Sequence, residues 1–238
     1  MTLDDLVRQL QHVHGDTLHA VVLYGSTASG EEVAGHSDFN VMLLAESLPL
    51  AHMRALGQTM RAWQEAGNPP VLELTIDEWR ASADIFPMEY ADILERHRVL
   101  FGELPLDGIT VNRADLRLQL EQEAMGKLLR LRRGVMVAGT DADRQRDLLR
   151  QSVGTLLVIF RAVLRLAGEV PPKDGQQVID AVGRRCGFDG TPYQRAAALR
   201  RGTTVADADL EGVLEGYLAG MTALVRYLDA FDAPPRER

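Results

Sequence analysis

The chain has 238 residues, of which 46% are apolar and 5% aromatic, enough for one large or two small domains with a sizeable core. A single cysteine, Cys186, excludes an internal disulfide framework and fits a reducing compartment. The net charge of −8 is uneven, because residues 1–111 carry −11 and residues 112–238 carry +3. An acidic half followed by a mildly basic one suggests two domains and argues against nucleic acid as the partner.

The hydropathy pattern gives no indication of a membrane partner. The sequence shows no signal-peptide pattern at its start and no apolar run of the roughly 18 residues that a membrane-spanning helix needs. We therefore expect a soluble cytoplasmic protein without a membrane partner, and a homodimer stays open.

The first half alternates between helical and strand patterns. Residues 3–13 have helical spacing behind Thr2, a candidate N-cap. Another helix begins at Pro49, and its apolar stripe is expected in the core: Met53, Leu56, Met60 and Trp63. Five short segments are predicted to be strands: residues 19–24, 39–45, 71–76, 86–93 and 98–101.

The second half is helical to its end. Helical patterns cover about residues 113–137, 142–167, 176–186, 192–200 and 207–231. The predicted fold class is therefore α/β followed by α. A small mixed twisted sheet with flanking helices occupies residues 1–108, and a helical bundle domain occupies residues 109–238.

One motif in the first half contains residues that are suited to ligand binding and catalysis. The strand at residues 19–24 stops at Gly25-Ser26, where a tight turn and a hydroxyl suit a phosphate. An 11-residue spacer, 27–37, then leads to Asp38-Phe39-Asn40 at the start of the next strand. Residues two apart on a strand share a face, so we expect Asp38 and Asn40 to point the same way.

This motif resembles the signature of the nucleotidyltransferase superfamily, whose members include DNA polymerase beta-like and kanamycin nucleotidyltransferase-like proteins. The resemblance implies a Mg²⁺-dependent transfer in which Gly25 and Ser26 hold the nucleotide phosphates. Asp38 would be a metal ligand and catalytic residue. Asn40 stands where the family has a second aspartate, so it would be a weaker, uncharged ligand.

The family also implies a third carboxylate, which accepts the proton of the attacking hydroxyl and helps to hold metal. Our first choice is Glu89, in the predicted strand at residues 86–93. Glu73 is the second choice. Asp92 is the third, because on a strand it would point away from Glu89.

The helical half is similar in layout to the substrate domain of kanamycin-type nucleotidyltransferases and to the HEPN bundles that partner minimal nucleotidyltransferases. In two-domain relatives a basic residue of this part reaches the triphosphate. Lys127 and Arg130, three apart on one helix, are the candidates, with a solvated helix face as the plainer interpretation.

Two functions follow from the resemblance. The first is transfer of a nucleoside monophosphate, with AMP from ATP preferred, to a hydroxyl of a small molecule or protein. The alternative, prompted by Asn40, is a catalytically impaired module that binds nucleotide or a protein partner, in an antitoxin-like or regulatory role.

Overall fold

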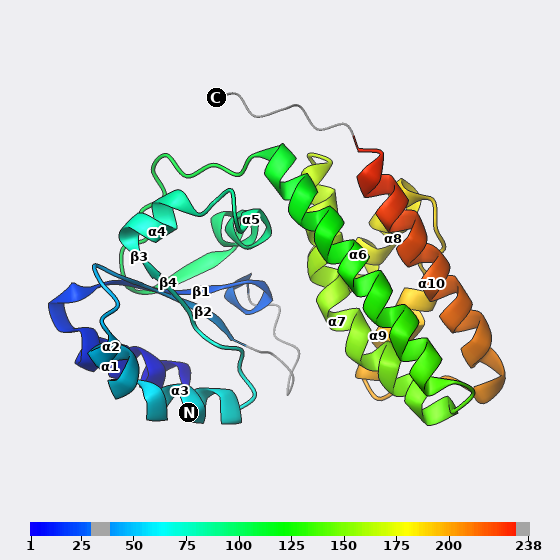
Figure 1. The fold of residues 1–238 in the computed structure, drawn as a ribbon, viewed down its shortest axis with the longest axis horizontal. Coiled ribbons are helices and arrows are strands. Elements are labelled where there is room, and N and C mark those ends of the chain that lie inside the picture. Colours follow the sequence, from blue (N-terminus) through cyan, green and yellow to red (C-terminus); the bar gives the residue numbers. More distant parts are fainter. Residues whose placement is uncertain (30–38, 232–238) are drawn as a thin grey trace. The chain divides into compact units, whose positions relative to one another are not determined.

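The computed structural model describes residues 1–29 and 39–231. It divides into two compact units, Met1–Val111 and Asn112–Arg238 (Figure 1). The boundary lies three residues beyond the predicted division between residues 108 and 109. No helix among the described residues is long and apolar enough to cross a membrane.

The first unit contains four strands and several helices. In chain order its elements are α1 (Leu3–His14), a 3-10 turn η1 (Gly15–Thr17), β1 (Leu18–Tyr24), a 3-10 turn η2 (Ser26–Ser29), β2 (Asn40–Ala45), α2 (Leu50–Ala55), α3 (Gly57–Glu65), β3 (Leu72–Thr75), α4 (Ile76–Ala81), α5 (Pro87–Glu95) and β4 (His97–Gly102). Thr2 is the N-cap of α1, as predicted, and it forms a capping box with Asp5.

The sheet is mixed, as expected, with strand order β3-β2-β1-β4. β1 is antiparallel to both β2 and β4, whereas β2 and β3 are parallel. Helices cover both faces (Figure 1), with α1, α2 and α3 on one side and α4 and α5 on the other. Because strand side chains alternate, each face of the sheet contributes to a separate core.

The core between the sheet and α4 and α5 contains Val22, Met42 and Leu44 of the strands together with the helix residues Trp79 and Tyr90. The two aromatic rings stack with centroids 4.3 Å apart. The Tyr90 hydroxyl donates a hydrogen bond of 2.7 Å to the Trp79 carbonyl oxygen. This pair joins α4 to α5 and so fixes the side of α5 that faces the sheet.

The opposite core lies under α1 and α3. It contains Leu6 and Leu10 of α1 and Trp63 of α3, packed on Val21, Leu23, Val41 and Leu43. The helix predicted to begin at Pro49 is two helices, α2 and α3, and its predicted core stripe holds only in part. Leu56 and Trp63 are buried, whereas Met53 is 46% exposed because it belongs to the short α2, which has no buried residue.

The segment predicted as a strand at residues 86–93 is the helix α5. The strand prediction for this segment is therefore wrong. Pro87 occupies the first turn, where its missing N–H costs nothing and its fixed φ suits a helix. The buried residues Tyr90 and Ile93 pack in the core on the sheet side of this helix.

The second unit is a helical bundle, as expected. Its helices are α6 (Arg113–Ala138), α7 (Ala142–Leu166), α8 (Gly175–Cys186), α9 (Thr191–Arg200) and α10 (Asp207–Asp229). All five predicted helices are confirmed within two residues at each end. In the bundle core the rings of Tyr193 and Tyr217 stack at 4.3 Å, and the Tyr193 hydroxyl donates to the Tyr217 carbonyl oxygen at 2.8 Å.

The first turns of α6 are tied to the ends of two other helices. Asn112 caps α6 by accepting a hydrogen bond from the Ala114 N–H. Arg113 donates to the carbonyl oxygen of Leu166, the last residue of α7, and Arg117 donates to that of Leu228, near the end of α10. A cation at a helix C-terminus satisfies carbonyls that have no partner in the helix, so these contacts close α7 and α10.

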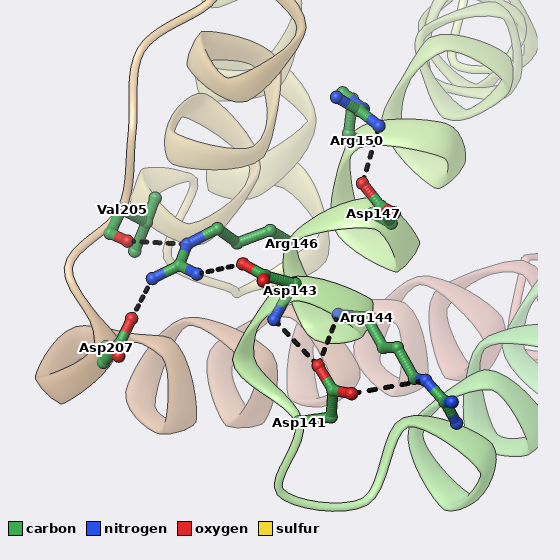
Figure 2. Close-up of polar contacts among 8 residues, drawn as sticks. All are labelled: Asp141, Asp143, Arg144, Arg146, Asp147, Arg150, Val205 and Asp207. Carbon is green, nitrogen blue, oxygen red and sulfur yellow. Dashed lines mark hydrogen bonds and ion pairs between the residues drawn. The ribbon is translucent and has the colours of Figure 1, made fainter.

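Arg146 joins the start of α7 to the start of α10 (Figure 2). Its Nε donates to the Val205 carbonyl oxygen at 3.0 Å, and its two terminal nitrogens bind Asp143 and Asp207. The hydrogen bond to Asp207 is the main cause of the raised pKa of this guanidinium. One planar group therefore binds three oxygens, one from α7, one from α10 and one from the segment just before α10.

Replacing Arg146 with methionine should lower the midpoint of thermal unfolding by a few degrees, because two segments far apart in sequence lose their common partner. Arg150→Met is the matched control. Arg150 pairs with Asp147 within one turn of α7, both side chains being 54% exposed, so its loss should shift the midpoint by less than about 1 °C. Differential scanning calorimetry of both variants tests this, and equal shifts would contradict it.

Candidate functional site

The turn after β1 is built around Gly25. This residue has φ of +83°, a conformation that L side chains rarely adopt. Its N–H donates to the Arg96 carbonyl oxygen at 3.3 Å, and its own carbonyl oxygen accepts from the Ala28 N–H at 3.2 Å. The strand therefore stops here, and the backbone enters the 3-10 turn η2, which begins at Ser26.

Two polar side chains meet at this turn. A β-carbon placed on Gly25 would lie 3.2 Å from Asn40 Nδ2 and 3.6 Å from Asp92 Oδ2. Asn40 opens β2 opposite Tyr24, and it shares the face of Met42 and Leu44 that is covered by α5. The absence of a side chain at Gly25 thus leaves a cradle next to an amide and a carboxylate.

The helix α5 presents both of its candidate acids to the same region. Glu89 and Asp92 are three residues apart, so on a helix they share a side. Burial, then the charges of Glu89 and Asp92, raise the pKa of the Tyr24 hydroxyl to about 12. The expectation that Asp92 points away from Glu89 is therefore wrong, because it assumed a strand.

Asp92 is also part of an ion pair that the sequence did not single out. Its Oδ1 lies 2.5 Å from an Arg96 terminal nitrogen, and the two side chains are only 15% and 13% exposed. Arg96 contributes its backbone oxygen to Gly25 as well. A carboxylate and a guanidinium of little exposure thus lie beside the turn, and the i, i+4 spacing on α5 was the sequence signal for them.

Thr27 follows in η2 and is 4% exposed. Its hydroxyl has no hydrogen-bond partner among the residues that the structure describes. Buried hydroxyls are nearly always paired, so this orphan next to the Gly-Ser turn is consistent with a site that is completed by a ligand.

Glu73, the second choice for the third acid, lies on the other side of the sheet. It is in register with Leu43, which packs in the core under α1 and α3, while Asn40 points to the α5 side. Burial raises the pKa of Glu73. Among the three acids considered, Glu89 and Asp92 are therefore the ones on the face of Asn40.

The donors at this turn fit a hard cation such as Mg²⁺, which prefers carboxylate and amide oxygens. Next to the Gly25 cradle lie a carboxylate oxygen of Asp92 and the amide group of Asn40, which turns its nitrogen toward the cradle. Asp38, the predicted principal ligand, lies outside the described residues. Within residues 1–29 and 39–231 no group of three or more His, Cys, Asp or Glu side chains is gathered as a metal site.

The two predicted basic residues lie in the second unit, on α6. Lys127 donates from Nζ to Thr155 Oγ1 of α7 at 2.9 Å. Burial, then the charge of Arg130, lowers the pKa of Lys127, while Glu123 opposes both. Arg130 lies 4.0 Å from a Glu123 carboxylate oxygen and is well exposed. Their role in nucleotide binding stays a prediction.

Among solved structures, the chain is similar to the crystal structure of a spectinomycin adenyltransferase from Enterococcus faecialis with ATP and spectinomycin. The two sequences are 13% identical, and the match has a TM-score of 0.59 and covers 95% of this chain and 98% of that chain. No protein-family model and no curated protein matches the sequence. This likeness, with the mixed sheet and the helices after it, shows that the chain has the nucleotidyltransferase fold that its sequence predicts.

Proposed function

We propose that this protein transfers a nucleoside monophosphate, AMP from ATP, to a hydroxyl group of a small molecule or protein. The observation that carries the proposal is the cradle at Gly25, where Asn40 and Asp92 lie against a turn of positive φ. The shared fold with an adenyltransferase that was crystallised with ATP and an acceptor supports it.

In this proposal the turn binds phosphate. The backbone N–H groups of Ser26 and Thr27, at the start of η2, are donors of the kind that a triphosphate needs, and no side chain at Gly25 obstructs its approach. Mg²⁺, when bound, neutralises the triphosphate and polarises its phosphorus, and Asp38, Asn40 and the carboxylates of α5 are the residues that would hold it.

Glu89 is the general base in this proposal. The hydroxyl oxygen of the acceptor attacks the α-phosphorus, the bond to pyrophosphate breaks, and the hydroxyl proton passes to the Glu89 carboxylate. Glu89 suits this role because it shares a side of α5 with Asp92 and lies close enough to the end of β1 for its charge to raise the pKa of the Tyr24 hydroxyl. Lys127 and Arg130 are the proposed cationic contacts to the triphosphate from the helical unit.

Asn40 favours one competing function, a module that binds nucleotide but does not turn it over. An amide brings no charge to a metal site, so a protein that depends on Asp38 and Asn40 alone would hold Mg²⁺ weakly. The two functions differ in whether pyrophosphate is released, and binding alone does not separate them.

Thermal unfolding with and without ATP and Mg²⁺ tests the shared part of both functions. Saturating ligand at about 100 times its dissociation constant stabilises by roughly 2.7 kcal/mol, so the midpoint should rise by about 5 °C or more. Asp38→Ala should abolish that rise. Glu89→Gln should keep most of the rise, because Asp38, Asn40 and Asp92 remain to hold Mg²⁺, but it should lower the rate of pyrophosphate release about 100-fold or more.

Glu73→Gln is the matched control, since it removes a carboxylate from the opposite face of the sheet. It should change neither the shift nor the rate. The absence of a shift with ATP, GTP, CTP and UTP would overturn the proposed function. A normal shift without pyrophosphate release from any hydroxyl compound would favour the binding module.

A further inference from the structure

One side of α6 carries a row of exposed apolar residues. Leu118 is 63% exposed, Met125 41%, Leu129 44% and Met136 74%. At about 100° per residue these four side chains fall within roughly 40° of arc on the helix. They lie away from the side that is buried in the bundle, which is formed by Leu116, Leu120, Ala124, Leu128 and Leu131.

The spacing of this row is that of a coiled-coil seam. Leu118, Met125, Leu129 and Met136 follow the alternating three- and four-residue steps of a heptad, and Gln122 and Arg132 occupy the two remaining seam positions. Both polar side chains are exposed. The seam spans residues 118–136, about 28 Å of helix.

The seam is symmetric about residue 127. In an antiparallel pair of α6 helices centred there, Leu118 faces Met136 of the second copy and Met125 faces Leu129. Gln122 then faces Arg132, so the guanidinium donates to the amide oxygen. A parallel pair would set Arg132 against Arg132, and this like-charge contact selects the antiparallel register.

The charges along α6 agree with this orientation. The half of α6 up to residue 125 has three acidic and two basic residues, whereas residues 126–138 have four basic and no acidic ones. Antiparallel pairing brings the acidic half of each helix to the basic half of the other. Lys127 contacts α7 on the other side of the helix, so it takes no part in the seam.

We propose that a second copy of this chain docks on α6 to form an isologous antiparallel helix pair through Leu118, Gln122, Met125, Leu129, Arg132 and Met136. This homodimer is independent of the proposed transferase function. Because one helix pair buries less than a standard protein interface, the dimer should dissociate on dilution.

Sedimentation velocity over a 100-fold range of concentration tests the interface. The wild type should shift from monomer to dimer. Met136→Glu should weaken dimerisation at least tenfold, whereas Val137→Glu should leave it unchanged, because Val137 is equally exposed at 74% but lies about 100° off the seam. Both sites are on the surface, so circular dichroism should show unchanged folding. A monomer throughout, or equal effects of the two variants, would overturn the proposal.

Disulfide trapping tests the register in a Cys186→Ala background. A mixture of Leu118→Cys chains and Met136→Cys chains should form the mixed disulfide readily. Leu118→Cys alone should form none, because its two copies would lie about 27 Å apart. A homodisulfide at position 118 would show a parallel pair and overturn the register, as would the lack of the mixed disulfide in a sample that sediments as a dimer.

Discussion

Gly102→Ala should destabilise the first unit by more than about 3 kcal/mol, enough to unfold it in many conditions. Gly102 ends β4, has φ of +69° and pairs with Ala20 on the central strand β1. A β-carbon there would lie 1.9 Å from the His19 carbonyl oxygen and 2.9 Å from the His19 carbonyl carbon. These are backbone atoms of a buried strand, so the clash is not relieved by a rotating side chain.

Gly108→Ala is the matched control for this prediction. Gly108 has a similar φ of +76°, but a β-carbon there would meet no described atom within 4 Å. Gly108→Ala should therefore lower the free energy of unfolding only by the penalty of an L residue at positive φ, about 1–2 kcal/mol. Urea unfolding followed by circular dichroism measures both variants. Equal losses of stability would show that the close approach of β4 to β1 contributes nothing.

Asn40→Asp should raise the affinity for Mg²⁺ about tenfold or more, which corresponds to roughly 1.4 kcal/mol. The new carboxylate would lie at the Gly25 cradle, next to Asp92 Oδ2. In EDTA the two negative charges repel, at a cost of about 1 kcal/mol, so the midpoint of unfolding should fall. With Mg²⁺ it should rise above that of the wild type, and the release of pyrophosphate should accelerate.

The diagnostic result is that Asn40→Asp lowers the midpoint of unfolding in EDTA and raises it in Mg²⁺, each relative to the wild type. Compared with Asp92→Asn alone, which already lacks the ion pair with Arg96, the double variant Asn40→Asp, Asp92→Asn should show no penalty in EDTA, because the carboxylate nearest to the new one is gone. Asn112→Asp is the control, since it makes the same chemical change at the N-cap of α6 and keeps the capping interaction. Manganese binding followed by electron paramagnetic resonance reports affinity directly. An affinity within twofold of the wild type would count against a metal site at Asn40.

Elements with a long or clean apolar period were predictable from the sequence. The long helices α6 and α7 were found within one residue, and so were β1 and β2, which border the Gly-Ser motif. The segment at residues 86–93 was not, because Met88 and Tyr90 alternate as on a strand, whereas in the structure the segment is a helix in which Tyr90 stacks on Trp79. That contact joins residues eleven apart and leaves no trace in local periodicity.

The candidate site was predictable only as far as its motif. Gly25 and Asn40 could be named because a turn and a polar strand opening are local signals. The sequence did not indicate that Asp92 and Arg96 belong to the site, because their distance from Gly25 depends on which side of α5 faces that turn. Glu73 could not be set aside either, because the register of β3 against β2 decides its face, and register is a property of two strands together.

The cap and the arginine contacts in the first turns of α6 have a consequence for how new chains of this kind could arise by recombination. Asn112, Arg113 and Arg117 supply the cap and two anchors, and all of their described partners belong to the helical unit. A gene segment that begins at Asn112 therefore encodes its own start signal for the bundle. Recombination at this junction would exchange the helical half as a cassette, without redesign of the helix that begins it.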